Sequence, residues 1–254
     1  MKRLLAALLL CCNALTAQEK LESLYERGEE HFFAGRIKEA LVEWDAQVKE
    51  NPASLPGHWQ RGLALYYAER YKDGRAQFET HQKVNSEDVE NAVWHFLCVA
   101  KLENAEAARK AFIPITHDRR VPMKEIHALF AGKGTEEAVL KAAEAKTEDT
   151  SAATLNMQRC YAHLYLGLYH EALGKTEKAK EHMLKAAELA SKGSYMGQVA
   201  VVHCKVRGWE GSPPAKAPST KHQAPEKPQA SNIKMREGRP GGLPDTVREL
   251  VFGA

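Results

Sequence analysis

The chain has 254 residues, of which 44% are hydrophobic and 27% charged, a composition typical of a globular protein with a buried core. The formal net charge is only +3, and residues 207–254 account for this excess because they hold eight Lys and Arg against five Asp and Glu. The remaining body is nearly neutral, so its electrostatic field is too weak to favour nucleic acid. We therefore expect no nucleic-acid partner.

The first seventeen residues have the pattern of an export signal. Lys2 and Arg3 precede the apolar run 4–10, and small and polar residues follow up to Ala17. This order is typical of a cleavable secretory signal, and the apolar run is too short to cross a bilayer as a mature helix. We expect cleavage after Ala17 and an exported protein, either periplasmic or secreted.

Two cysteines at the end of the apolar run leave lipid attachment open as an alternative. Cys11 follows Leu10, and Cys12 follows Cys11, so neither is preceded by the small residue that a lipoprotein signal favours. Ordinary cleavage is therefore the favoured prediction. Membrane contact is expected only if one of these cysteines is lipidated.

Three cysteines remain after cleavage, and each lies in an apolar stretch. They are Cys98, Cys160 and Cys204. An odd number argues against a full disulfide framework, so we expect buried small hydrophobic side chains. One disulfide between Cys160 and Cys204 is the alternative.

Residues 18–206 show helical periodicity interrupted by glycine and proline, which predicts an all-α domain. The predicted helix pairs lie at 19–34 with 36–50, 56–69 with 71–84, 88–102 with 104–115, 123–131 with 135–146, and 161–173 with 176–191. A last apolar helix at 195–206 has no partner, and we expect it to cover the exposed end of the stack.

The first pairs repeat with a period of 34 residues. Arg27-Gly28 recurs as Arg61-Gly62, and Trp44 recurs as the aromatic Phe78. Such a period is typical of stacked helix pairs, because a single pair cannot bury its apolar face alone. We expect the glycines, with Gly167 in the last pair, to allow close helix approach. The small residues expected to face them are Ala40, Gly74, Ala108 and Ala179, and the large residues expected to fill the gap towards the next pair are Trp44, Phe78, Phe112 and Met183.

This spacing resembles the tetratricopeptide repeat (TPR). The stretches RGLALYY at 61–67 and YLGLYHEALG at 165–174 are also similar to the NlpI-type TPR lipoproteins of bacterial envelopes. The resemblance implies a right-handed α-solenoid of about five helix pairs with a C-terminal capping helix. It also implies a periplasmic adaptor that holds envelope proteases or cell-wall hydrolases without chemistry of its own. A clear lipobox is missing, and plastid proteins of similar pattern make a plastid lumen the alternative compartment.

In such a repeat the first helix of each pair lines the concave face, where a protein or peptide partner is expected to bind. Aromatic side chains anchor many interfaces, and several fall on this face. The predicted partner-binding residues are Tyr25, Phe33, Trp59, Leu63, Tyr66, Tyr67, Trp94, Lys101 and Tyr165. Two alternatives stay open: the rings pack between neighbouring pairs, or they are buried in a homodimer of a self-associating structural domain.

Patterns for metal binding and catalysis are weak. His95 with Cys98, and His203 with Cys204, offer two ligands each, whereas a structural zinc site needs four. The sequence has no HExxH run, glycine-rich phosphate loop or GxSxG elbow. We therefore expect no enzyme activity, no metal and no cofactor, with an envelope enzyme as the less favoured alternative.

Three further features are potential recognition elements. A carboxylate clamp would need Arg27, Arg61 and Lys101 to converge on the groove, and this is not the favoured prediction. The loop 116–122 contains paired arginines that could bind a carboxylate or phosphate, although a solvated connector is favoured. Residues 207–254 hold seven of the eleven prolines, which predicts a disordered tail with a short docking helix near 244–252 as an alternative.

Overall fold

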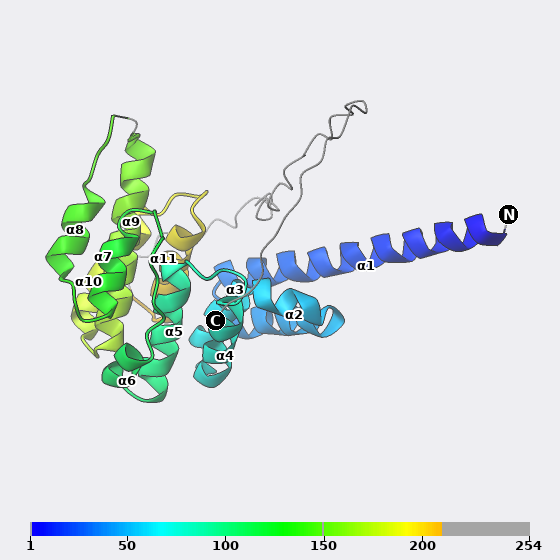
Figure 1. Cartoon of the computed structure of the whole chain (residues 1–254), viewed down its shortest axis with the longest axis horizontal. Coiled ribbons are helices and arrows are strands. Elements are labelled where there is room, and N and C mark those ends of the chain that lie inside the picture. The colour runs from blue at the N-terminus through cyan, green and yellow to red at the C-terminus, as the bar shows by residue number, and fades with distance from the viewer. Residues whose placement is uncertain (1, 149, 210–254) are drawn as a thin grey trace, which may run out of the picture. The chain divides into compact units, whose positions relative to one another are not determined.

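A computed structural model describes the backbone of residues 2–148 and 150–209 and, within these ranges, the side chains from residue 18 onwards. The described residues form eleven α-helices and one 3-10 helix, and they include no strand (Figure 1). The predicted all-α fold class is therefore confirmed. Among these helices, none has both the length and the apolar composition needed to cross a membrane.

The first two pairs lie close to their predicted positions. Helix α1 (Lys2–Phe33) and α2 (Ile37–Glu50) form the first pair, joined by a turn in which Gly35 has a φ of 78°. A 3-10 helix, η1 (Pro52–Gly57), leads into α3 (Trp59–Tyr67) and α4 (Tyr71–His81). Helix α1 includes the residues assigned to the export signal, and their cleavage stays a prediction.

The middle of the chain departs more from the prediction. Helix α5 (Val89–Leu102) begins as expected, because the Asp88 side chain caps it by accepting a hydrogen bond from the Glu90 backbone N–H. Its partner α6 (Ala105–Lys110) ends well before residue 115. Pro114 accounts for part of this difference, since a residue before proline avoids the helical conformation. Two short helices follow, α7 (Met123–Phe130) and α8 (Glu136–Ala143).

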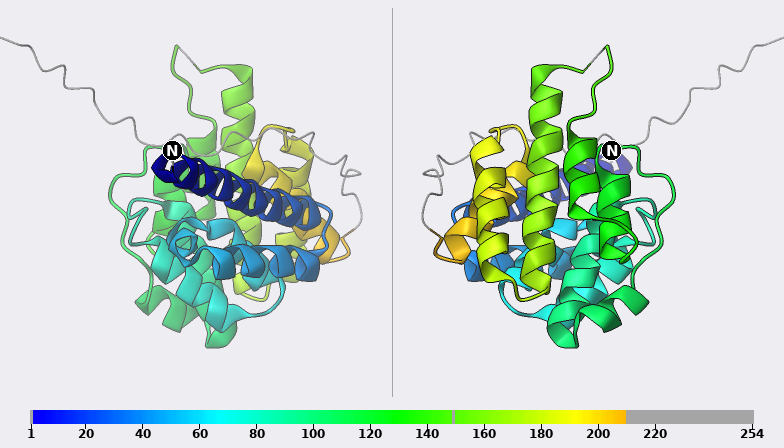
Figure 2. Two further views of the ribbon diagram at one scale, coloured as in Figure 1. Left: turned by 90° about the vertical axis from the view of Figure 1, so that its right-hand side faces the viewer. Right: turned by 90° about the vertical axis from the view of Figure 1, so that its left-hand side faces the viewer.

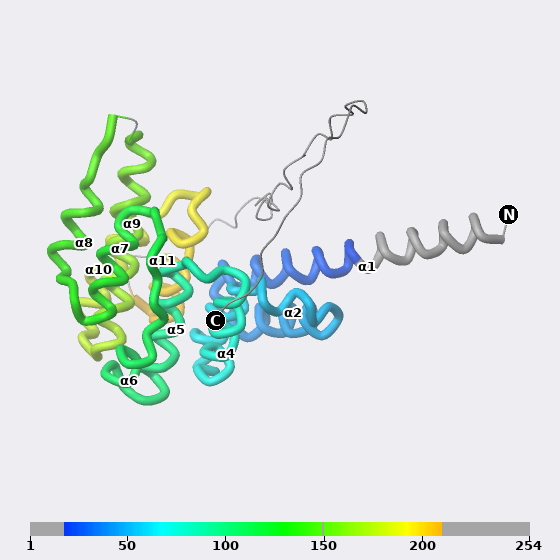
Figure 3. The backbone as a smooth tube through the Cα atoms, in the orientation of Figure 1, coloured from blue at the N-terminus to red at the C-terminus, as the bar shows by residue number. Residues whose placement is uncertain are grey.

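The last pair consists of α9 (Ala152–Ala172) and α10 (Thr176–Leu189), and α11 (Tyr195–Val206) has the predicted bounds. The chain order of these helices can be followed in Figure 3. Helix α9 starts nine residues before the predicted position because Ser151 caps it, its hydroxyl accepting a hydrogen bond from the Thr154 backbone N–H.

Paired helices pack through one recurring contact. A glycine in the first helix faces a large side chain sixteen residues further on, and the contacts are Gly28 with Trp44, Gly62 with Phe78, and Gly167 with Met183. A Cβ atom at Gly62 would lie 2.7 Å from the Phe78 ring, and one at Gly167 would lie 3.0 Å from Met183 Cε. These glycines allow close helix approach, as predicted. The side chain nearest to each is the large residue of its own pair, however, which was predicted to fill the gap towards the next pair.

Helix α11 contacts α10 and α9, and it also contacts α1 at the beginning of the chain. Figure 2 shows α11 in yellow and orange beside these helices. Most of its residues are buried, from Met196 to Cys204, as expected for a helix that is apolar around its whole circumference. Its role is thus broader than the predicted cover for one end of a stack.

Residues at the start of the predicted tail also belong to the folded body. Arg207 forms an ion pair with Glu171, and the Trp209 backbone N–H donates to the Cys204 carbonyl. The body therefore extends beyond the predicted boundary at residue 206. The predicted disorder and docking helix of the tail concern residues from 210 onwards, which lie outside the described ranges.

Candidate functional site

The nine predicted partner-binding side chains lie on α1, α3, α5 and α9, the helices expected to line the inner face. Two of them, Tyr25 and Trp59, are partly buried, and Lys101 is exposed. The other six are buried in the core: Phe33, Leu63, Tyr66, Tyr67, Trp94 and Tyr165. The packing alternative therefore describes these six side chains, although Leu63 and Trp94 also line a pocket that is described below.

Helix α11 covers this aromatic face. The Tyr195 ring packs edge-on against Phe33 and Trp59, with ring centroids 4.9 and 4.8 Å apart. Further along α11, the His203 ring packs edge-on against Tyr67, and their Nδ1 and hydroxyl are 3.2 Å apart. The face on which a partner or a second copy was predicted to bind is therefore occupied by a helix of the same chain.

An ionic network fixes the end of α11 to α9 and α5. Glu171 on α9 is 12% exposed, and its carboxylate lies 2.5 Å from Arg207, 3.3 Å from His203 and 3.6 Å from Lys101. Burial alone would raise the pKa of Glu171, but His203, Arg207 and Lys101 together hold it below its ordinary value. Lys101, predicted to contact a partner, instead pairs within the chain.

The basic residues of the predicted carboxylate clamp do not converge. Arg27 binds Glu43 on α2, and Arg61 binds Asp45 on α2. With Lys101 engaged by Glu171, each cation has its own acidic partner on a different part of the surface. The three residues therefore do not form a common site for a C-terminal carboxylate.

A pocket of about 140 Å³ lies where α3, α4, α5 and α11 meet. Three residues of the predicted partner-binding set, Trp59, Leu63 and Trp94, come together in its wall. The complete lining is Trp59, Leu63, Phe78, His81, Asp88, Glu90, Asn91, Trp94 and Met196. The polar members were missed because the prediction considered mainly aromatic side chains on the first helices, and because His81 lies on α4, a second helix of its pair.

The polar side of this pocket carries excess negative charge. Arg120, from the loop 116–122, lies 2.6 Å from Asp88, 3.1 Å from Glu90 and 2.6 Å from Asp118. The guanidinium of Arg120 thus forms ion pairs with three carboxylates. Burial raises the pKa of Glu90 above its ordinary value, and the nearby Arg120 opposes this rise. The predicted use of this arginine for an outside anion is not supported, because its guanidinium is engaged by the chain's own acids.

Three polar atoms on the pocket residues are buried without a hydrogen-bond partner in the described part of the chain. They are Glu90 Oε1, Asn91 Oδ1 and Trp94 Nε1. Buried polar groups are normally hydrogen-bonded, so an unpaired set marks a place where a ligand group could bind. The lining of the pocket therefore combines two tryptophans and a leucine with polar and acidic side chains.

The cysteines are buried, and the two histidine–cysteine pairs considered as weak metal patterns contact other residues. Cys160 and Cys204 are both buried and are not bonded to each other, and burial raises the pKa of the Cys160 thiol to about 11. His95 Nε2 lies 3.3 Å from Glu79, and His203 faces Tyr67. The predicted alternative of a Cys160–Cys204 disulfide is therefore wrong, and the two histidine–cysteine pairs have other contacts.

Comparisons with known proteins give no assignment. No model of a known protein family matches the chain, and no curated protein is similar enough in sequence to count as a relative.

Proposed function

We propose that the chain is a non-catalytic interaction scaffold that binds a peptide segment of a protein partner in the pocket between α3, α5 and α11. The observation that carries this proposal is the pocket itself, which joins an apolar wall to acidic and unpaired polar groups. Protein partners are commonly recognised through one or a few side chains that enter such a depression.

The pocket favours a partner side chain that is both basic and largely apolar. A Lys or Arg stem would pack on Trp59 and Trp94, and its charged end would reach Glu90 and Asp88. Such a cation would neutralise the excess negative charge around Arg120, and tryptophan faces attract cations further. The volume of about 140 Å³ suits one side chain rather than a drug-sized ligand.

A TPR-type α-solenoid is part of the same proposal. The 34-residue repeat and the recurring contacts of Gly28 with Trp44 and Gly62 with Phe78 support it. The export pattern of residues 1–17 supports a role in the cell envelope, where the NlpI-type resemblance suggests a protease or cell-wall hydrolase as the partner.

Selection of peptides from a random displayed library on the purified full chain tests the proposal. We expect enrichment of sequences that place Lys or Arg beside an aliphatic or aromatic residue. The variants Asp88→Asn and Glu90→Gln keep the shape of the pocket but remove its charge, and Asn still caps α5. Each variant should bind a selected peptide with an affinity lower by about 10- to 100-fold, which corresponds to the loss of a hydrogen bond to a charged group.

The matched control is Glu181→Gln, an exposed carboxylate on α10 that is not part of the pocket. This control should bind the selected peptide as the unmodified chain does. Circular dichroism establishes that all variants remain folded. If the library yields no enriched sequence, or if both pocket variants bind the selected peptide unchanged, the proposal is wrong.

A further inference from the structure

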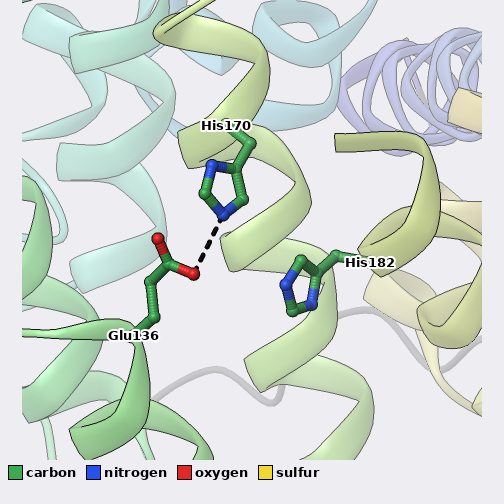
Figure 4. A group of neighbouring side chains, drawn as sticks. All are labelled: Glu136, His170 and His182. Carbon is green, nitrogen blue, oxygen red and sulfur yellow. Dashed lines mark ion pairs between the residues drawn. The ribbon is translucent and has the colours of Figure 1, made fainter. Parts of the chain in front are cut away.

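Three helices bring two histidines and a glutamate together at a point that is not part of the pocket described above. Glu136 is the first residue of α8, His170 lies near the end of α9, and His182 lies in α10. One donor atom from each residue lies within 4.8 Å of the others, and Figure 4 shows the three side chains turned toward one another.

His170 is the central residue of this group. It is fully buried, and neither of its ring nitrogens makes a hydrogen bond of good geometry with any described residue. Glu136 Oε2 lies 3.1 Å from His170 Nε2. Because buried imidazole nitrogens are normally satisfied by a donor, an acceptor or a metal, this arrangement needs an explanation.

A further histidine fixes the ring of His182. His163 Nδ1 lies 2.9 Å from His182 Nδ1, which leaves the Nε2 of His182 for another ligand. Figure 4 shows this nitrogen on the side of the ring that faces Glu136 and His170. Metal-binding histidines are commonly held in this way, with one nitrogen on the ion and the other on a neighbouring group.

The charge of the group favours a cation. Within the described ranges, the one ion-pair partner of Glu136 is His170, so this carboxylate is not neutralised by a lysine or arginine. The donor set of two imidazoles and one carboxylate excludes a preference for Ca²⁺ or Mg²⁺, which favour oxygen ligands. It suits Zn²⁺ and related ions, which bind His₂Glu sets with a fourth position open to water.

We infer that Glu136, His170 and His182 bind a divalent transition-metal ion of the zinc type, with His163 as a positioning residue. Bonds from zinc to nitrogen and oxygen are about 2.0–2.2 Å long, so the ligand atoms must approach one another more closely than 4.8 Å. The side chain of Glu136 is 35% exposed and can make this movement. The ion would link α8 to the α9–α10 pair.

Titration of the metal-free full chain with Zn²⁺ and with Co²⁺ tests this inference. We expect one equivalent of Zn²⁺ to bind by calorimetry, and the visible spectrum of bound Co²⁺ to show nitrogen and oxygen ligands without thiolate. The melting temperature should rise on Zn²⁺ addition, because the ion binds only the folded arrangement of three helices.

Substitutions at the proposed ligands test whether the ion binds at this group. Glu136→Gln and His182→Gln remove one ligand each with little change in volume and should abolish stoichiometric binding, and His163→Gln should weaken it by about 10- to 100-fold. The matched control Glu137→Gln changes the next residue of the same helical turn, which is exposed and outside the group, and should bind as the unmodified chain does.

Melting curves without metal show whether each variant is folded. If the full chain binds no equivalent of Zn²⁺, the inference is wrong. It is equally wrong if the folded variants Glu136→Gln and His182→Gln bind the ion as tightly as Glu137→Gln does, because the ion would then occupy other ligands.

Discussion

The contacts within the helix pairs and the contacts made by α11 are built on different principles. Within the pairs, a glycine meets a large side chain sixteen residues later, as Gly28 meets Trp44 and Gly62 meets Phe78. The contacts of α11 do not repeat, and they join distant parts of the chain through polar groups, as Tyr67 with His203 and Glu171 with Arg207.

This difference separates two sources of stability. The repeating contacts are local and steric, so their contribution depends on shape and is largely independent of pH. The α11 contacts include buried charged and hydrogen-bonding groups, which stabilise only when every partner is present and in the right ionisation state. Changes at the two kinds of contact should therefore differ in size and in their response to pH.

The largest effect is expected for Glu171→Leu. This change leaves the partly buried Arg207 and the exposed Lys101 without their shared, largely buried carboxylate, and breaking a buried network by removing one partner costs up to about 3–5 kcal/mol. Urea unfolding measures the loss. Glu188→Leu changes an exposed carboxylate of α10 and should be nearly neutral. Equal stability of the two variants would show that the network does not hold α11.

Acid should weaken the α11 contacts through the buried His203, and it should also act on His58, a buried residue before α3 that lies outside the repeating glycine contacts. Burial lowers the pKa of His203 and of His58, which packs against Trp44, to about 4 in each case. In the unfolded chain both titrate near 6.5, so the unfolded state binds more protons between these values. Their stabilisation is complete above pH 6.5 and is lost as the pH falls toward 4.

Each histidine contributes up to about 1.4 kcal/mol per pH unit to this slope. Urea midpoints measured from pH 7 to pH 4 for His58→Gln and His203→Gln should fall less steeply than those of the unmodified chain. The control His117→Gln, at an exposed loop position, should keep the original slope. Parallel curves for all four proteins would contradict the assignment of these two histidines.

A smaller, purely steric effect is expected for Gly62→Ala. The added methyl would lie 2.7 Å from the Phe78 ring, and overpacking of this kind typically costs about 1–3 kcal/mol. A residue larger than alanine should unfold the pair locally, which circular dichroism would show as a lower melting temperature. Gly193→Ala is the control, because a Cβ atom there has no neighbour within 4 Å. Unchanged melting of Gly62→Ala would mean that α3 and α4 can separate freely.

The smallest changes in the free energy of unfolding are expected at two adjacent tyrosines. Tyr67→Phe removes the hydroxyl that contacts His203 at 3.2 Å and should cost about 0.5–1.5 kcal/mol. Tyr66→Phe removes a buried hydroxyl that makes no hydrogen bond within the described ranges, so it should be neutral or slightly stabilising. Chemical unfolding of both variants shows which is less stable. A lower stability of Tyr66→Phe than of Tyr67→Phe would contradict the role assigned to Tyr67.

The sequence was a good guide to local structure. Glycine and proline positions predicted most helix ends, and the 34-residue period predicted that Gly62 allows close helix approach, because these features depend on residues close together in the chain. The period did not predict that Phe78 would face Gly62 of its own pair. The early start of α9 was missed because a single Ser151 cap carries little signal. The short α6 was missed because its apolar periodicity continues past Lys110 to Phe112, which packs in the following loop.

The candidate sites were harder to predict, since they depend on long-range contacts. Trp59 and Trp94 line the same pocket, but the sequence carried no sign that α11 would cover the neighbouring aromatic side chains. Glu136, His170 and His182 are separated by 34 and 12 positions and match no metal-binding spacing. Only the packing of three helices brings them within 4.8 Å of one another.

The position of α11 also affects how the chain can fold as it is synthesised. Phe33 and Tyr67 leave the ribosome long before their covering residues Tyr195 and His203. Contacts between such distant segments form slowly, and uncovered aromatic surface is prone to aggregation in the meantime. The nascent chain therefore passes through a stage in which its future interior is exposed, and a chaperone that shields aromatic surface would be most useful until α11 has emerged.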